Sequence, residues 1–292
     1  MIGTGRAHAA ITIVNALPTG VGCAIGVSIP VTATVELEVA GRGESPRLEI
    51  ESGSDTPLVR EALREALARG PPDAAWSGSL RVASEIPPSR GLKSSSAVAA
   101  AVAAATLRAL GRSPEPVEIA RLSARVGRQV GLSATGAFDD ALAGLTSGFV
   151  ITDNREDAVL RSTPVDPALR VALLIPPMVH SPSPEWRSAF ERRAAESRAA
   201  LEHAVAGRWG LACDANTALV EEVMGYDYRD LRARLRERGA FACGVTGLGP
   251  TLAALVDADH AHELLEDLPS DLGERRLVPV ATGEPIARPE AE

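Results

Sequence analysis

The spacing of apolar and polar residues along the chain predicts a mixture of strands and helices. Short alternating or β-branched stretches predict strands. They cover residues 9–17, 27–39, 79–86, 170–176, 240–246, 251–256 and 275–281. Stretches with helical periodicity, several of them bounded by Pro or Gly, predict helices. They cover residues 57–70, 94–110, 115–130, 139–145, 184–206, 209–224, 228–238 and 257–267. Because strands and helices occur in runs, the order favours an α+β fold over a doubly wound parallel sheet.

Composition and charge narrow the class of protein. The chain has 292 residues, of which 45% are hydrophobic and 23% charged, which is enough for two globular domains. Its net charge of −8 argues against a nucleic-acid-binding protein, because such a protein needs a basic face. No apolar run approaches the ~20 residues of a membrane-spanning helix. The three widely spaced cysteines fit a reducing compartment. We therefore expect a cytoplasmic protein without nucleic-acid or membrane partners, and with a loose tail over residues 283–292.

The segment from Pro87 to Ala97 (PPSRGLKSSSA) is the strongest candidate for a phosphate site. It leads into the predicted helix 94–110, which is apolar on nearly all sides and is therefore expected to be buried. A helix N-terminus offers unpaired amides and a partial positive charge to an anion. A single serine here would more simply be an N-cap, but three in a row after Gly-Leu-Lys favour phosphate binding. The residues expected to bind the nucleotide are Pro88, Gly91, Leu92, Lys93, Ser94, Ser95 and Ser96.

A second candidate is the acidic pair Asp139–Asp140, which follows a Thr-Gly turn (TGAFDDA). Either carboxylate alone could equally be a favourable charge in the first turn of a helix. Transfer of a phosphoryl group to an alcohol needs one carboxylate that accepts or orients the hydroxyl proton. Together with a phosphate site, the pair therefore indicates a kinase.

Two further segments contain glycine turns. Residues 244–251 (GVTGLGPT) lie between two predicted strands and could form a simple hairpin turn. Gly247 and Gly249 would also let the backbone approach a ligand closely. Residues 12–22 (TIVNALPTGVG) join the first predicted strand to a second glycine-rich turn.

These four segments resemble the motifs of the GHMP kinase superfamily, and most closely those of the archaeal-type shikimate kinases. The serine-rich loop resembles P-x-x-x-G-L-G-S-S-A, with Lys93 at the second glycine, and the acidic segment resembles T-G-A-[FY]-D-D-A. Residues 244–251 resemble the third motif, and residues 12–22 resemble T-I-I-N-A-I-x-T-G-K-G, with Val21 at the lysine. The resemblance covers nearly the whole chain. Since a side chain replaces glycine at residue 93, we expect an ordinary backbone φ there.

The resemblance implies a fold and a set of roles. It implies the two-domain GHMP fold, with a ribosomal protein S5 domain 2-like N-terminal domain (1–160), a C-terminal α/β sandwich (161–292) and the active site between them. It implies that the serine-rich loop wraps ATP, that Ser95 helps to hold Mg²⁺, and that Asp139 is the catalytic residue. Gly247 and Gly249 would back the loop. The residues expected to bind the acceptor are Asn15, Thr19, Asp140 and Thr246, with Arg6, Arg90 or Arg187 on its carboxylate.

The function that the resemblance implies is phosphorylation of the 3-hydroxyl of shikimate by ATP, with small-molecule partners only; the chain could also form a homodimer. Two alternatives stay open at this point. The same chemistry could act on homoserine, mevalonate or a cyclitol, because Val21 departs from the family motif. The chain could instead be a catalytically silent binding module with the same fold.

Overall fold

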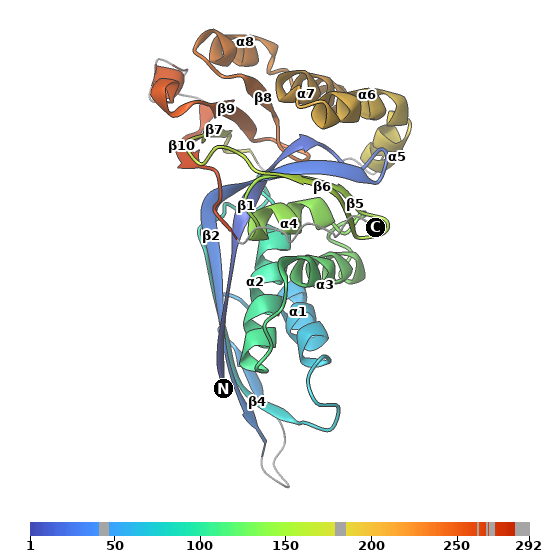
Figure 1. The fold of residues 1–292 in the computed structure, drawn as a ribbon, viewed down its shortest axis with the longest axis vertical. Coiled ribbons are helices and arrows are strands. Elements are labelled where there is room, and N and C mark those ends of the chain that lie inside the picture. Colours follow the sequence, from blue (N-terminus) through green and yellow to red (C-terminus); the bar gives the residue numbers. More distant parts are fainter. Residues whose placement is uncertain (41–46, 179–184, 262, 267, 269–271, 284–292) are drawn as a thin grey trace.

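The computed structural model describes residues 1–40, 47–178, 185–261, 263–266, 268 and 272–283. These residues form two β-sheets, each with its own group of helices (Figure 1). The first sheet has the order β3-β4-β2-β5-β6, and β1 pairs antiparallel with the long strand β2. Its strands are β1 (Ile2–Val14), β2 (Val21–Val39), β3 (Leu48–Ile50), β4 (Trp76–Ser84), β5 (Phe149–Asp153) and β6 (Ala158–Thr163).

Four helices pack beside the first sheet. They are α1 (Pro57–Leu67), α2 (Ser94–Ala109), α3 (Pro116–Gln129) and α4 (Phe138–Leu145). The alanine-rich α2 lies directly on β1, as its apolar sequence predicted. Glycines on β1 allow this close approach, because a Cβ at Gly3 would lie 2.1 Å from the carbonyl oxygen of Ala105. Small residues on both elements thus place the N-terminus of α2 next to the end of β1.

The second sheet has the order β10-β7-β9-β8, and its paired strands are antiparallel. Its strands are β7 (Arg170–Ile175), β8 (Ala242–Val245), β9 (Leu252–Val256) and β10 (Glu274–Pro279). The accompanying helices are α5 (Trp186–Glu191), α6 (Ala194–Val205), α7 (Trp209–Met224) and α8 (Arg229–Glu237). Helix α7 contacts both β8 and β1, and Trp209 stacks on Phe149 of the first sheet at 5.3 Å between ring centroids. The two halves therefore share an apolar interface.

The predicted α+β class is confirmed, and most predicted elements agree with the structure. The predicted domain boundary between residues 160 and 161 falls inside β6, and the division at this point stays a prediction. The strand predicted over residues 9–17 is the second half of β1, which starts at Ile2 and ends at Val14. No helix of the described part of the chain is long and apolar enough to cross a membrane.

Several predicted elements differ from the structure. The single helix predicted over residues 184–206 is wrong, because the backbone leaves helical geometry at Arg193 (ψ 24°) and splits the described part into α5 and α6. The helix predicted over 257–267 is also wrong in its described part. That part forms 3₁₀ turns at Ala258–His260 and Glu263–Leu265, since its hydrogen bonds span three residues. Strands β3, β5 and β6 were not predicted. Except for Gly283, the predicted loose tail lies outside the described residues.

Candidate active site

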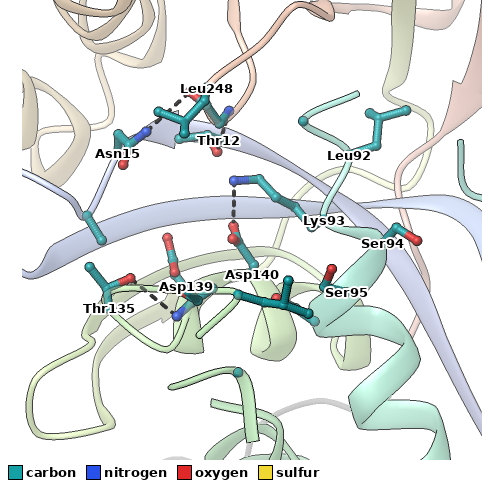
Figure 2. Close-up of a pocket in the computed structure, with 18 of the residues that line it drawn as sticks. Thr12, Asn15, Leu92, Lys93, Ser94, Ser95, Thr135, Asp139, Asp140 and Leu248 are labelled. Atoms are coloured by element: carbon teal, nitrogen blue, oxygen red, sulfur yellow. Dashed lines mark hydrogen bonds and ion pairs between the residues drawn. The ribbon is translucent and has the colours of Figure 1, made fainter. Parts of the chain in front are cut away.

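The four sequence motifs meet at one cavity of about 500 Å³. Its lining comes from the end of β1, the loop before α2, the start of α4 and the turn between β8 and β9. Figure 2 shows the Lys93 side chain pointing toward Asp140. Asp139 lies next to Asp140, and Asn15 and Leu248 lie on the other side of the lysine ammonium group. The predicted site residues that line the cavity are Asn15, Gly91, Leu92, Lys93, Ser94, Ser95, Ser96, Asp139, Asp140, Gly247 and Gly249. The serine-rich helix start and the acidic pair therefore face a common space.

The N-terminus of α2 is open toward this cavity. Lys93 is the N-cap residue, and its side chain makes no capping hydrogen bond. In the part of the chain that the structure describes, the amides of Ser94, Ser95 and Ser96 donate to no acceptor, and the three serine hydroxyls make no hydrogen bond. An uncapped helix start of this kind is a site for an anion such as phosphate.

The backbone at Lys93 differs from the sequence expectation. Its φ is 65° and its ψ is 29°, which is the left-handed region, so the expectation of an ordinary φ was wrong. Residue 93 keeps the conformation that suits glycine although it carries a long side chain, and this costs about 1–2 kcal/mol. The ammonium group lies 3.1 Å from Oδ1 of Asp140, and the lysine side chain is only 14% exposed. The ion pair gives the strained residue a specific contact inside the cavity.

Hydrogen bonds between distant segments hold the loop before α2 in place. The hydroxyl of Thr246 donates to the carbonyl oxygen of Gly91 (3.0 Å) and accepts from the amide of Thr12 (3.1 Å). Gly91 has a φ of 79°, and a Cβ there would lie 2.3 Å from the carbonyl oxygen of Thr246. Glycine is therefore required at residue 91. Residues 244–251, the third motif, pack against the loop before α2, as the resemblance implied.

Three predicted site residues do not line this cavity. The Thr246 hydroxyl is fully buried and used by the loop, so the structure gives it a structural role in place of the predicted substrate contact. The Thr19 hydroxyl exchanges hydrogen bonds with the backbone of Val21, at 3.2 and 3.3 Å. Pro88 is exposed. Asn15 lines the cavity, and its amide group donates to the carbonyl oxygen of Gly247 at 3.2 Å.

Asp139 is held by a residue that the sequence analysis missed. The side-chain amide of Asn154 donates to Oδ1 of Asp139 at 2.7 Å, and Oδ1 of Asn154 accepts from the Asp139 amide at 3.2 Å. The other carboxylate oxygen, Oδ2, lies against Gly22, where a Cβ would be 2.2 Å away. Asn154 directly follows β5. If this short apolar strand had been predicted from the sequence, Asn154 would have been recognised as a polar residue at its end.

Two family models match the chain. The model described as "GHMP kinases N terminal domain" matches residues 57–148, and the model described as "GHMP kinases C terminal" matches residues 197–274. The matched residues include the serine-rich loop, the acidic pair and the turn between β8 and β9. The chain belongs to the GHMP kinase family.

Relatives and solved structures agree with this assignment. Shikimate kinase from Methanocella arvoryzae is 35% identical over 87% of this chain and 85% of the relative. Shikimate kinase from Pyrococcus abyssi is 35% identical over 91% and 95% of the two chains. The solved homoserine kinase from Cytophaga hutchinsonii covers 97% of this chain and 96% of its own, with a TM-score of 0.73 and 15% identity, which supports the fold alone. The chain is thus an ATP-dependent small-molecule kinase with the GHMP fold.

The arginine candidates of this GHMP kinase lie in different places. Arg6 is on β1 and lines neither described cavity. Arg90 lines the main cavity, but its guanidinium donates to the carbonyl oxygens of Pro177 (2.8 Å) and Met178. Arg187 lines a second cavity next to the first.

The acidic pair of this GHMP kinase makes folding stability depend on pH. Burial and the neighbouring Asp139 charge raise the pKa of Asp140 to about 7, although the Lys93 ammonium acts in the opposite direction. The folded chain therefore holds a proton that an unfolded chain releases near an ordinary carboxyl pKa. Since the unfolded state binds fewer protons between about pH 4 and pH 7, stability decreases as pH rises through this range, by at most ~1.4 kcal/mol per pH unit.

We predict that Asp140→Asn removes the part of the pH dependence of folding stability that the raised pKa of Asp140 causes. The free energy of unfolding, measured by urea titration at pH 5 and at pH 7.5, should fall less between the two values in the variant than in the wild type. The comparison uses the difference between the two pH values, so any pH-independent effect of losing the Lys93 contact cancels. Equal pH dependence in both proteins would contradict the raised pKa of Asp140.

Proposed function

We propose that this chain is a shikimate kinase, which transfers the γ-phosphoryl group of ATP to the 3-hydroxyl of shikimate. The observation that carries the proposal is the common cavity of the uncapped α2 N-terminus and Asp139. These are the two parts that phosphoryl transfer to an alcohol needs. The acceptor is proposed from the shikimate kinases of Methanocella arvoryzae and Pyrococcus abyssi, which align over most of both chains.

In the proposed complex, the amides of Ser94, Ser95 and Ser96 bind the ATP phosphates at the helix start. The serine hydroxyls add further donors, since they make no hydrogen bond within the described residues. Mg²⁺ prefers oxygen ligands and is usually held by phosphates with only one or two protein groups. The Ser95 hydroxyl would suit such an ion, which would neutralise charge on the phosphates.

Asp139 acts on the acceptor in this proposal. Asn154 occupies Oδ1, which leaves Oδ2 to accept a proton from the acceptor hydroxyl or to orient it. The hydroxyl oxygen forms a bond to the γ-phosphorus while the bond from that phosphorus to the β,γ-bridging oxygen breaks, and ADP leaves. The proton passes to the medium through Asp139. Lys93 provides positive charge between the phosphate loop and the acidic pair, which balances the carboxylate of Asp140.

An acceptor panel tests the proposal. We expect ADP release and labelled product with γ-labelled ATP and shikimate, and much slower transfer to homoserine, mevalonate or a cyclitol. Product analysis should place the phosphate on the 3-hydroxyl. Efficient transfer to another acceptor and none to shikimate would overturn the proposed substrate. ATP binding without acceptor-dependent ADP release across the panel would instead favour a silent binding module.

A further inference from the structure

A second cavity, of about 550 Å³, lies next to the proposed transfer site. Both cavities are lined by Leu17, Ala134 and Thr135, so they share a wall. Asn154 also lines the second cavity, and it is the residue that holds Oδ1 of Asp139. The second cavity therefore lies beside the residues that position Asp139.

The second cavity is rich in arginine. Arg128, Arg155 and Arg187 line it, together with one carboxylate, Glu191. Arg128 is already neutralised, because its guanidinium pairs with Asp157 at 2.5 Å. In the described ranges, the side chains of Arg155, Arg187 and Glu191 make no hydrogen bond or ion pair. Two arginines without a charged partner among the described residues thus line the cavity together with one carboxylate, which leaves it with an excess of positive charge.

Arg155 is placed by its surroundings. Its side chain lies across the turn at Gly20, where a Cβ would be 2.5 Å from the arginine Nε and 2.9 Å from its Cγ. The same turn is tied to the adjacent residue, because the Asn154 amide donates to the carbonyl oxygen of Gly20 at 2.8 Å. The Arg155 amide is itself held by the carboxylate of Asp153 at 2.9 Å. One turn after β5 therefore carries both the partner of Asp139 and a cationic side chain of the second cavity.

Arg187 approaches from the other half of the molecule. It belongs to α5, and its guanidinium carbon lies 5.6 Å from the ring centroid of Trp186. A planar guanidinium binds a carboxylate through two parallel hydrogen bonds. Arginines from two different elements, neither with a charged partner in the described part of the chain, suit a carboxylate group.

We propose that Arg155 and Arg187 bind the carboxylate of the acceptor, so that the kinase selects small hydroxy acids. This inference rests on the proposed function, since it takes an acceptor whose hydroxyl is phosphorylated next to Asp139. It assigns Arg155 the larger part, because its side chain lies against the turn at Gly20, next to Asn154. Neutral alcohols of similar size would lose this contact and react poorly.

The test compares an acid with its neutral ester in wild-type and variant enzymes. Arg155→Met should lower kcat/KM for shikimate by about 10- to 100-fold, which corresponds to the loss of one hydrogen-bonded charge pair. It should leave kcat/KM for methyl shikimate and the KM for ATP nearly unchanged. Arg187→Met should act in the same direction. Arg198→Met, an exposed arginine on α6 that lines neither cavity, is the matched control and should change neither acceptor.

The outcomes separate this inference from the proposed function. Equal losses for acid and ester, or unchanged shikimate kinetics in Arg155→Met, would overturn the carboxylate site while shikimate kinase activity stands. A raised KM for ATP alone would overturn it as well, because the arginine would then serve the phosphates. If the wild type phosphorylates homoserine and not shikimate, the proposed substrate fails. The same acid and ester comparison with homoserine then supports or overturns the role of Arg155.

Discussion

Asp139→Asn is expected to lower kcat for acceptor phosphorylation by about 10²- to 10⁴-fold, the usual contribution of a positioned acid or base. The replacement keeps the size of the side chain, and its oxygen can still accept from the side-chain amide of Asn154, as Oδ1 of Asp139 does at 2.7 Å. The group that faces Gly22 changes from a carboxylate oxygen to an amide, which cannot take the proton of the acceptor. The phosphate-binding amides at the start of α2 are unchanged.

The measurement for Asp139→Asn combines steady-state kinetics with a nucleotide titration. The dissociation constant for an ATP analogue should stay within a few-fold of the wild-type value, while product formation nearly stops. Asp230→Asn, an exposed carboxylate on α8, makes the same chemical change away from the cavity and should have wild-type kinetics. A turnover rate close to wild type in Asp139→Asn would remove this residue from the proposed role.

Substitution of Lys93 is expected to have the second large effect. Lys93→Met leaves the buried Asp140 without its ammonium partner and removes positive charge from the phosphate end of the cavity. Because one such electrostatic group is worth about 10²- to 10³-fold in kcat, we expect a loss of that order. Steady-state kinetics with ATP and shikimate measure it.

A second substitution at this position separates charge from backbone strain. Lys93→Gly removes the same charge, but glycine adopts the observed φ of 65° without strain. The glycine variant should therefore be as slow as Lys93→Met and more stable than it, by about 1 kcal/mol in urea unfolding. Lys93→Arg keeps a positive charge and should retain more activity than either. Wild-type kcat in Lys93→Met would show that the ion pair with Asp140 does not support catalysis.

The main cavity could be predicted because each of its motifs joins a distinctive residue type to the end of an element. Serines and glycine before an alanine-rich helix indicate an anion site wherever the helix lies. The Thr-Gly turn before Asp139 and Asp140 indicates that both carboxylates lie in the first turn of a helix. Because all four motifs resemble those of one family, they were expected to line one cavity. The structure confirms this for residues such as Ser95 and Asp139.

The second cavity could not be predicted, because it depends on tertiary contacts. Asn154 and Arg155 follow β5, which has only five residues and was not predicted as a strand. Without that strand, nothing in the sequence placed the two residues near Asp139. The left-handed backbone of Lys93 was missed for a related reason. A lysine at a family glycine suggests relaxed geometry, and only the position of Asp140 shows which contact accompanies the strained conformation.

Lys93 is the single lysine of the sequence, so the site can be labelled selectively with an amine-reactive reagent. In this sequence an acylating reagent finds a single lysine side chain, the ammonium group of Lys93. Mass spectrometry can therefore follow the occupancy of the phosphate loop as protection of the peptide that contains Lys93. Arginine-rich surfaces elsewhere on the molecule do not contribute to that signal.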